Sequence, residues 1–340
     1  MNVSELAATA RAIVAPGKGI LAADESSGTI KKRFDKIGVE STEENRRFYR
    51  DLLFTTDGVE EFISGVILFD ETIRQSTSDG VPFPKALADK GIIPGIKVDK
   101  GAKPLALAAE GETVTEGLDG LRERFAEYRD LGARFAKWRA TYTITDELPS
   151  QYTIDVNADA LARYAALSQE AGIVPIVEPE VLMDGTHTIG RAGDVTAAVL
   201  EAVFHALYEQ RCVFEGLLLK PNMVLPGYDS PKQVSDEEIA EASVRCYRSA
   251  VPAAVPGIVF LSGGQSDEEA SARLNAMNLL GPNPWELSFS YGRALQAAAQ
   301  QAWKGDATNS DAAQRAFYHR AKMNSLARYG KYSPDMERAA

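Results

Sequence analysis

The chain has 340 residues, of which 45% are hydrophobic and 25% charged, and its formal net charge is -11. This composition excludes a disordered chain, and the negative charge argues against binding to nucleic acid or to anionic membranes. No apolar run reaches the length of a membrane span, and the two cysteines, Cys212 and Cys246, fit no metal-ligand spacing. We therefore expect a globular protein of the cytoplasm, although a plastid protein whose transit peptide has been removed would look similar.

The first twenty residues predict a short helix that ends before Pro16. Eight short apolar runs then alternate with longer amphipathic stretches, and such continuous apolar runs are typical of parallel strands buried on both faces. The runs are 19–24, 65–70, 93–98, 133–138, 173–178, 216–220, 257–262 and 286–290. Ser41, Ser235 and Ser266 each precede a glutamate by three residues, which is the capping-box spacing of a helix start.

Eight near-equal strand–helix units predict an α/β fold closed into a TIM (β/α)8 barrel rather than a doubly wound sheet. The segment from 24 to 65 and the segment from 291 to about 329 are long enough for additional helices near both ends of the chain. No interdomain linker interrupts the pattern. We therefore expect a single domain over residues 1–340, in which residues 331–340 form a short C-terminal tail.

Polar side chains gather where the predicted strands end. Because the carboxyl ends of all eight strands meet at one mouth of such a barrel, these residues should share one cavity. The alternation of side chains along a strand also places Lys137 on the same face as Arg139, and Glu178 on the same face as Glu180. The strand tips carry Asp24, Lys97, Lys137, Arg139, Glu178, Glu180, Lys220, Ser262, Gly263, Gly264, Ser290, Gly292 and Arg293.

Each tip residue also has a simpler interpretation when taken alone. A lysine at a strand end usually extends to solvent, and two glutamates are more often a solvated strand end than an acid–base pair. Their coincidence at one mouth favours catalysis. The three histidines form no metal-ligand pair, which argues against a transition-metal site. Lys220 follows three leucines, and an amine that burial and neighbouring cations deprotonate can attack a ketone to give an iminium ion.

Proton transfer and phosphate binding complete this hypothesis. Glu178 and Asp24 are placed to move protons beside the lysine. The glycine-containing loops come directly after the last two strands, which is where barrels of this kind commonly bind phosphate. Arg293 supplies a positive charge there. The residues therefore predict an enzyme that acts on a phosphorylated ketose.

The sequence resembles the class I fructose-1,6-bisphosphate aldolases, which are metal-independent and form a Schiff base. The matching strings are spread over residues 11–333. They include GKGILAADES (17–26), GIKVDKG (95–101), FAKWR (135–139), AGIVPIVEPE (171–180), LLKPNMV (218–224), FLSGGQS (260–266) and FSYGRALQ (289–296). The resemblance implies reversible cleavage of fructose 1,6-bisphosphate to dihydroxyacetone phosphate and glyceraldehyde 3-phosphate in glycolysis and gluconeogenesis, without a cofactor.

The resemblance also implies roles for residues at matching positions. Lys220 corresponds to the Schiff-base lysine, Glu178 to the residue that moves protons during imine formation, and Asp24 to the base that takes the proton of the C4 hydroxyl. Lys137 would stabilise developing charge, and Glu180 would order the lysines. Ser262, Gly263, Gly292 and Arg293 fall at the C1-phosphate end, Ser26, Arg33 and Lys97 at the far phosphate, and Ser290 at the border of the site. Gly264 and Arg139 are further expected substrate-binding residues.

Three matters stay open at this point. Related Schiff-base activities on sedoheptulose 1,7-bisphosphate or fructose 1-phosphate would use the same groups. Family members are commonly homotetramers, which the resemblance implies here too. Animal relatives have a tail that ends in a tyrosine implicated in proton exchange at the enamine, whereas this sequence closes with GKYSPDMERAA. Tyr329, Tyr332, another group or water would replace it, so removal of residues 331–340 should affect enamine protonation less than tail removal does in such relatives.

Overall fold

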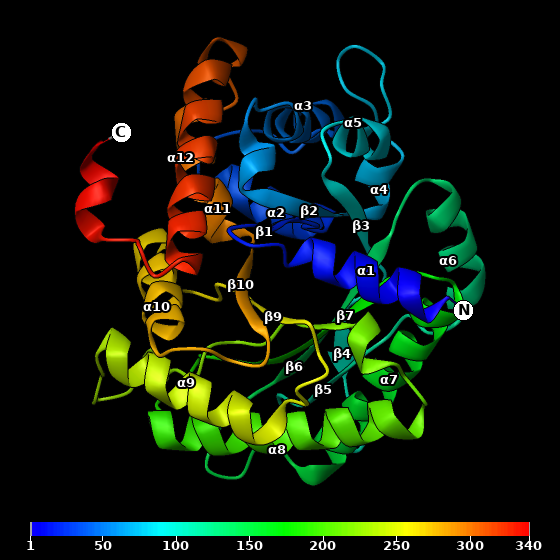
Figure 1. The fold of residues 1–340 in the computed structure, drawn as a ribbon, viewed down its shortest axis with the longest axis vertical. Coiled ribbons are helices and arrows are strands. Elements are labelled where there is room, and N and C mark those ends of the chain that lie inside the picture. The colour runs from blue at the N-terminus through cyan, green and yellow to red at the C-terminus, as the bar shows by residue number, and fades with distance from the viewer. Residues whose placement is uncertain (1, 340) are drawn as a thin grey trace.

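The computed structural model describes residues 2–339 and contains a closed barrel of eight parallel strands (Figure 1). Around the barrel the strands follow the order β1, β10, β9, β8, β7, β6, β3, β2. They are β1 (Gly19–Ala23), β2 (Ile63–Leu68), β3 (Ile93–Lys97), β6 (Phe135–Tyr142), β7 (Val174–Val181), β8 (Leu218–Leu219), β9 (Gly257–Phe260) and β10 (Glu286–Tyr291). Each of the eight predicted apolar runs overlaps one of these strands, so the predicted barrel is confirmed.

Large and small side chains alternate inside the barrel. Phe135 on β6 is fully buried and points toward β3 and, beyond it, β2, where Gly95 and Gly65 leave room for its ring. A Cβ atom at Gly95 would lie 2.3 Å from Phe135 Cζ, so an alanine there would collide with the ring. The glycines in these two strands therefore allow a dense interior in spite of the cost of glycine in a strand.

Helices cover the outside of the barrel between successive strands (Figure 1). The connections contain α2 (Ser27–Asp35), α3 (Glu43–Phe54), η1 (Val59–Glu61), α4 (Asp70–Ile73), α5 (Phe83–Asp89), α6 (Leu121–Asp130), α7 (Gln151–Glu170), α8 (Ile189–Glu209), η2 (Phe214–Gly216), α9 (Asp236–Ala250) and α10 (Asp267–Leu279). After the last strand come α11 (Arg293–Trp303), η3 (Ala307–Asn309), α12 (Ser310–Arg328) and η4 (Pro334–Ala339). The additional helices thus lie in the two segments where the sequence predicts them.

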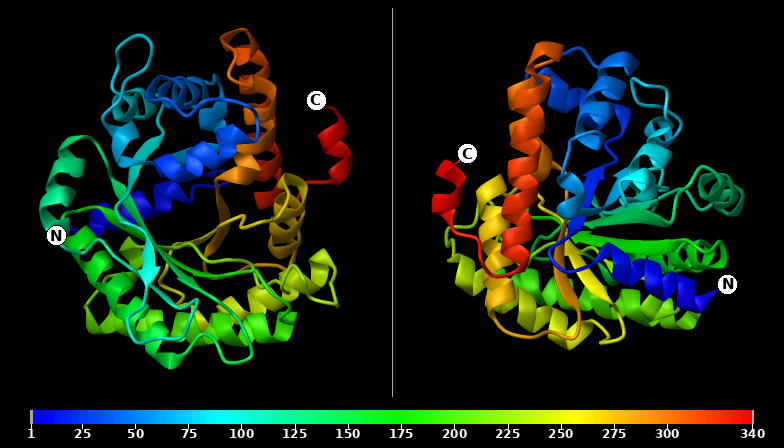
Figure 2. Two further views of the ribbon diagram at one scale, coloured as in Figure 1. Left: turned by 180° about the vertical axis from the view of Figure 1, so that it is seen from behind. Right: turned by 45° about the horizontal axis from the view of Figure 1, so that its top comes forward.

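The N-terminal helix α1 (Val3–Ile13) closes the amino end of the barrel. Its residues Leu6, Ala10 and Ile13 are buried in one apolar cluster with interior strand residues such as Ile20 and Val174. The helix lies in front of the strands in Figure 1 and behind them when the molecule is turned by 180° (Figure 2). The opposite end of the barrel, where the carboxyl ends of the strands meet, is the end that can receive a ligand.

Two of the three predicted capping boxes are present. Ser235 and Glu238 begin α9, and Ser266 and Glu269 begin α10, with both reciprocal hydrogen bonds formed in each pair. The third prediction is wrong by one residue, because Thr42 rather than Ser41 is the N-cap of α3. This register places two glutamates in the first turn, where the positive end of the helix dipole favours them.

A short hairpin between β3 and β6 has no counterpart among the predicted elements. It consists of β4 (Ala102–Pro104) and β5 (Thr113–Thr115), which pair in antiparallel fashion. All three β4 residues are exposed, so this strand carries no apolar run from which a sequence pattern could identify it. Thr115 donates a hydrogen bond of 2.7 Å to the carbonyl oxygen of Arg139, which fixes the hairpin to β6.

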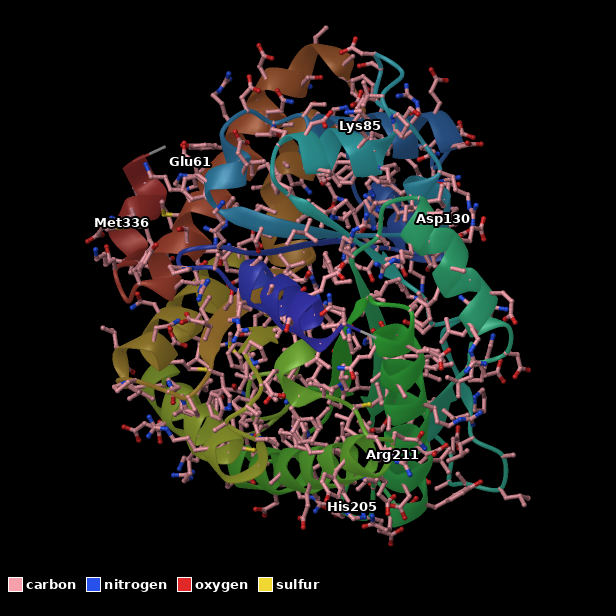
Figure 3. The ribbon with its side chains drawn as sticks, turned by 45° about the vertical axis from the view of Figure 1, so that its right-hand side comes forward. Glu61, Lys85, Asp130, His205, Arg211 and Met336 are labelled. Atoms are coloured by element: carbon pink, nitrogen blue, oxygen red, sulfur yellow. The ribbon has the colours of Figure 1, made fainter. Side chains whose placement is uncertain are left out.

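The C-terminal segment folds back onto α12. Tyr332 is buried, and its hydroxyl donates to Glu337, which also pairs with His319 and Arg320 of α12. Figure 3 shows Met336 of this segment at the periphery of the molecule. Tyr329 lies beside Gly17, just before β1, and therefore at the amino end of the barrel. The structure thus places neither tyrosine at the mouth.

Candidate active site

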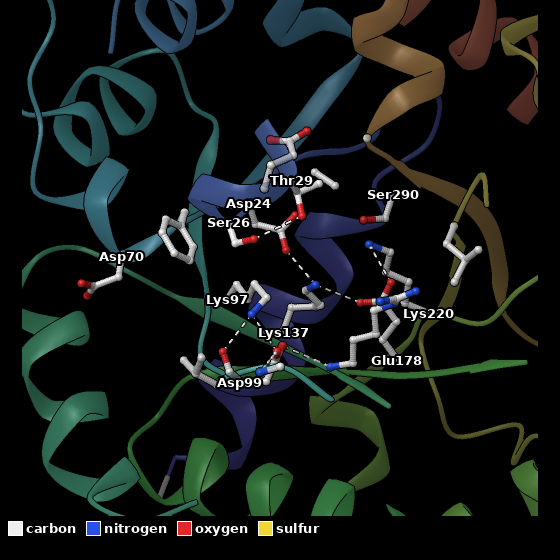
Figure 4. Close-up of a pocket in the computed structure, with 18 of the residues that line it drawn as sticks. Asp24, Ser26, Thr29, Asp70, Lys97, Asp99, Lys137, Glu178, Lys220 and Ser290 are labelled. Carbon is white, nitrogen blue, oxygen red and sulfur yellow. Dashed lines mark hydrogen bonds and ion pairs between the residues drawn. The ribbon is translucent and has the colours of Figure 1, made fainter. Parts of the chain in front are cut away.

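A cavity of about 880 Å³ opens at the carboxyl ends of the barrel strands (Figure 4). Its wall carries nine lysine and arginine side chains against seven aspartates and glutamates, a local excess of +2 in a chain of net charge -11. Such an excess attracts anionic ligands to the cavity. The predicted residues that line it are Asp24, Ser26, Arg33, Lys97, Lys137, Arg139, Glu178, Glu180, Lys220, Ser262, Gly263, Ser290, Gly292 and Arg293.

The adjacent strands β6 and β7 bring four charged side chains into the cavity. Lys137 and Arg139 are two residues apart on β6, as are Glu178 and Glu180 on β7, so each pair shares one face. Lys220 follows the two-residue strand β8, and its backbone N–H donates a 2.8 Å hydrogen bond to the carbonyl oxygen of Val177. The lysine backbone is therefore fixed to β7 beside Glu178.

A chain of ion pairs occupies the centre of the site. Lys137 Nζ lies 2.7 Å from Asp24 Oδ2 and 3.1 Å from Glu178 Oε2, while Lys220 Nζ lies 3.2 Å from Glu178 Oε1. Figure 4 shows Lys137 between the two carboxylates and Lys220 beyond Glu178. The relative exposure of Lys137, Glu178 and Lys220 is only 3–4%. These charges are therefore held out of bulk water, where their interactions are strong.

The neighbours of the two carboxyls control their protonation. Burial by itself would raise the pKa of Asp24, but Lys137 and Lys220 more than offset this effect and hold the pKa well below its usual range. Burial acts on Glu178 in the same way, and Lys137, Lys220 and Arg139 lower its pKa. Burial would lower the pKa of Lys137, but Asp24 and Glu178 raise it. Both carboxyls are thus ionised and Lys137 is protonated at neutral pH.

Glu180 and Ser290 lie on two sides of this centre. The carboxylate of Glu180 accepts a hydrogen bond from Arg139 Nε and forms an ion pair with this arginine. The expected role of Glu180 in ordering the lysines stays a prediction. Ser290 is 1% exposed, and its hydroxyl has no hydrogen-bond partner among the described residues. A buried hydroxyl on a cavity wall that lacks a partner is available to a ligand.

A second cationic region lies across the cavity, where two acidic residues missed by the sequence-based reasoning orient the cations. Asp99 accepts a 2.6 Å hydrogen bond from Lys97 Nζ through its side chain and a 2.8 Å bond through its backbone carbonyl. Glu25 pairs with Arg33 and with the buried Arg50. The alternation that places Asp99 two residues after Lys97, on the same side of the chain, is a signal that could have identified it.

The third part of the site is the loop after β9 together with the start of α11. Gly263 has a φ of +54°, and its carbonyl oxygen accepts a hydrogen bond from Arg293, the first residue of α11. Ser262, Gly263 and Gly292 thus lie beside a helix N-terminus, which is a favourable environment for an anion. Gly264 is the one predicted site residue outside the cavity lining, because it packs against Tyr228 behind the loop.

No group of three or more histidines, cysteines, aspartates or glutamates within the described part of the chain is arranged to hold a metal ion. Among the helices of residues 2–339, none has the length and apolar character needed to cross a membrane.

Residues 5–340 match the model of one protein family, which is described as fructose-bisphosphate aldolase class-I. The chain belongs to the class I fructose-bisphosphate aldolases. This aldolase is a lyase that reversibly cleaves fructose 1,6-bisphosphate into dihydroxyacetone phosphate and glyceraldehyde 3-phosphate.

Individual relatives are similar over nearly the whole length of this aldolase. A probable fructose-bisphosphate aldolase class 1 from Xylella fastidiosa is 61% identical and covers 98% of the chain and 99% of the relative. Fructose-bisphosphate aldolase C from Rattus norvegicus is 57% identical, with coverage of 96% and 91%. A crystal structure of fructose-bisphosphate aldolase from Plasmodium falciparum superposes with a TM-score of 0.96 at 52% identity, covering 97% and 96%. The barrel and its mouth are therefore a fold shared by this family.

Proposed function

We propose that Lys220 is the nucleophile of this aldolase. Its neutral amine attacks the C2 carbonyl of the ketose to give a carbinolamine, and loss of water from the carbinolamine leaves an iminium ion. The observation that carries the proposal is the position of Lys220 Nζ, which is nearly buried and 3.2 Å from Glu178 Oε1. A carboxylate at this distance can take the ammonium proton before the attack.

Glu178 returns this proton to the hydroxyl group of the carbinolamine, which leaves as water. Asp24 takes the proton of the C4 hydroxyl, and the C3–C4 bond breaks so that its electron pair moves into the iminium ion and forms an enamine. Protonation and hydrolysis of the enamine then release dihydroxyacetone phosphate. Lys137, which contacts both carboxylates, keeps them ionised and able to accept protons.

The two cationic regions fit the two phosphate groups of the substrate. We assign the C1 phosphate to Ser262, Gly263, Gly292 and Arg293, because backbone groups at a helix N-terminus and a guanidinium favour a dianion there. The far phosphate falls to Ser26, Arg33 and Lys97, with Arg139 and Ser290 between the two ends. A cation cluster at each end of the cavity favours a bisphosphate over fructose 1-phosphate.

The larger organisation follows the same resemblance. We propose that the enzyme acts in the cytoplasm as a homotetramer, as the resemblance to class I aldolases implies, and sedimentation of the purified protein tests the assembly. We also propose that residues 1–340 form a single domain with residues 331–340 as its tail. The burial of α1 against interior strand residues and of Tyr332 near α12 supports this assignment.

Borohydride trapping tests the central assignment. Reduction in the presence of dihydroxyacetone phosphate should fix the substrate carbons to the enzyme, and peptide mass mapping should find the adduct on Lys220. The Lys220→Arg variant should form no adduct, whereas Lys85→Arg, at an exposed lysine paired with Asp89, should react like the wild type (Figure 3). An adduct on Lys137, or a normal adduct yield in Lys220→Arg, would overturn the proposal.

A further inference from the structure

Two side chains press against the back of the loop Ser262–Gly264, on the side away from the cavity. A Cβ atom at Gly263 would lie 1.7 Å from Met183 Cε, and one at Gly264 would lie 1.8 Å from Tyr228 Oη. Such distances are far inside van der Waals contact, so the two side chains fill the space that larger residues in the loop would need. Ser262 and Gly263, in contrast, line the cavity.

The segments that carry Met183 and Tyr228 are joined to each other by backbone hydrogen bonds. Met183 follows the end of β7, and Tyr228 lies in the segment after β8. The backbone N–H of Tyr228 donates a 2.9 Å bond to the carbonyl oxygen of Met183, and Asp229 donates a 3.0 Å bond to Gly185. Tyr228 Oη also lies 3.7 Å from Met183 Sδ. The two side chains therefore form one wall, supported by backbone hydrogen bonds between two loops.

The Tyr228 hydroxyl lies directly beside Gly264. Burial raises the pKa of Tyr228, while the backbone of Gly264 and the positive charge of Arg293 act in the opposite direction. Met183 is only 5% exposed, whereas Tyr228 is 49% exposed. The wall thus has one buried member and one that covers the loop from the solvent side.

We propose that Met183 and Tyr228 are positioning residues that hold the Ser262–Gly264 loop in the conformation that receives the C1 phosphate. The inference rests on the proposed function, in which this loop binds that phosphate. Two consecutive glycines have access to many backbone conformations, and Gly263 adopts the left-handed region. The close packing of these two side chains behind the loop restricts these alternatives before the substrate binds, so less of the binding free energy is lost in ordering the loop.

Loss of the wall should weaken binding at one end of the substrate only. If the competent loop conformation falls to about one tenth of the population, the apparent affinity for dihydroxyacetone phosphate falls about tenfold. Glyceraldehyde 3-phosphate binds across the cavity near Lys97 and Arg33, where neither wall residue has a contact, so its KM should stay unchanged. The turnover number should also change little, because Lys220, Glu178 and Asp24 lie on other elements.

The test is the aldol condensation, with each substrate varied in turn, in Met183→Ala and Tyr228→Ala. We expect the KM for dihydroxyacetone phosphate to rise about five- to twentyfold in each variant, with kcat and the KM for glyceraldehyde 3-phosphate within about twofold of the wild type. Met183→Leu and Tyr228→Phe, which keep most of the volume, should restore the KM. Tyr208→Ala, at a tyrosine 74% exposed near the end of α8, is the matched control and should behave like the wild type.

Arg293→Ala separates failure of the inference from failure of the proposed function. If this variant leaves the KM for dihydroxyacetone phosphate unchanged, the C1-phosphate assignment itself is wrong. If Arg293→Ala raises this KM while both wall variants leave it unchanged, the assignment stands and the inference is overturned. Equal losses in both KM values, or loss of kcat alone, would also overturn it. Should one alanine variant fail to fold, as judged by circular dichroism, the other wall residue decides the outcome.

Discussion

Replacing Glu178 with glutamine perturbs the centre of the site most sharply, because one carboxylate contacts two buried lysine side chains, at 3.1 and 3.2 Å. Removal of one partner from a buried ion pair costs about 3–5 kcal/mol. Asp24 remains 2.7 Å from Lys137 and still compensates that lysine. We therefore expect a loss at the lower end, about 3 kcal/mol, which lowers Tm by about 4 °C in a chain of this length.

The same substitution removes the proposed proton carrier, so kcat should fall by a factor of about 10² to 10⁴. Calorimetry measures Tm, and a coupled assay of fructose 1,6-bisphosphate cleavage measures kcat. Glu170→Gln, which removes an exposed partner of Arg122, is the control and should change stability by less than about 0.5 kcal/mol. A Glu178→Gln enzyme with unchanged Tm and with kcat within threefold of the wild type would refute the reasoning.

Three further predictions concern pH, the tail and metals. The pKa values of Asp24 and Glu178 are lowered in the folded state, so the stabilisation that these carboxylates contribute is present above their unfolded pKa values of about 4. It is lost as the pH falls through the folded pKa values. Because Lys137 helps to lower both pKa values, Lys137→Met should unfold at a higher pH in an acid titration followed by circular dichroism. Deletion of residues 331–340 removes Tyr332 and Glu337, which pack near α12 outside the cavity, so it should lower Tm but leave detritiation of labelled dihydroxyacetone phosphate near the wild-type rate. Collapse of that rate would show that the tail takes part. Prolonged incubation with EDTA should leave cleavage activity unchanged, and recovery of lost activity by added Zn²⁺ would contradict this.

The barrel could be predicted from the sequence because its strands are buried on both faces and therefore apolar throughout. The run at 216–220 contains only the two-residue strand β8, yet its three leucines placed Lys220 correctly at the mouth. The shared-face argument likewise placed Lys137 with Arg139 and Glu178 with Glu180, since alternation in a strand is a property of the local backbone.

Contacts between loops could not be predicted in this way. Gly264 belongs to the same short string as Ser262 and Gly263, but the structure turns it toward Tyr228 instead of the cavity. Glu25 pairs with Arg50 across 25 residues of sequence, and no local pattern reports that distance. The exposed hairpin strand β4 also lacked a signal, because a strand without an apolar face has no periodicity to detect.

The packed interior of the barrel, which α1 covers at the amino end, leaves the cavity at the carboxyl ends of the strands as the place where the described residues can receive a ligand. A ketose bisphosphate enters, and both trioses leave, through the opening at the carboxyl ends of the strands. In the proposed mechanism the dihydroxyacetone half stays covalently bound as the enamine after C3–C4 cleavage, so the aldehyde half leaves through this opening first. The apolar core beneath the cavity therefore separates the site from the amino end of the barrel, and α1 adds further apolar contacts to that core.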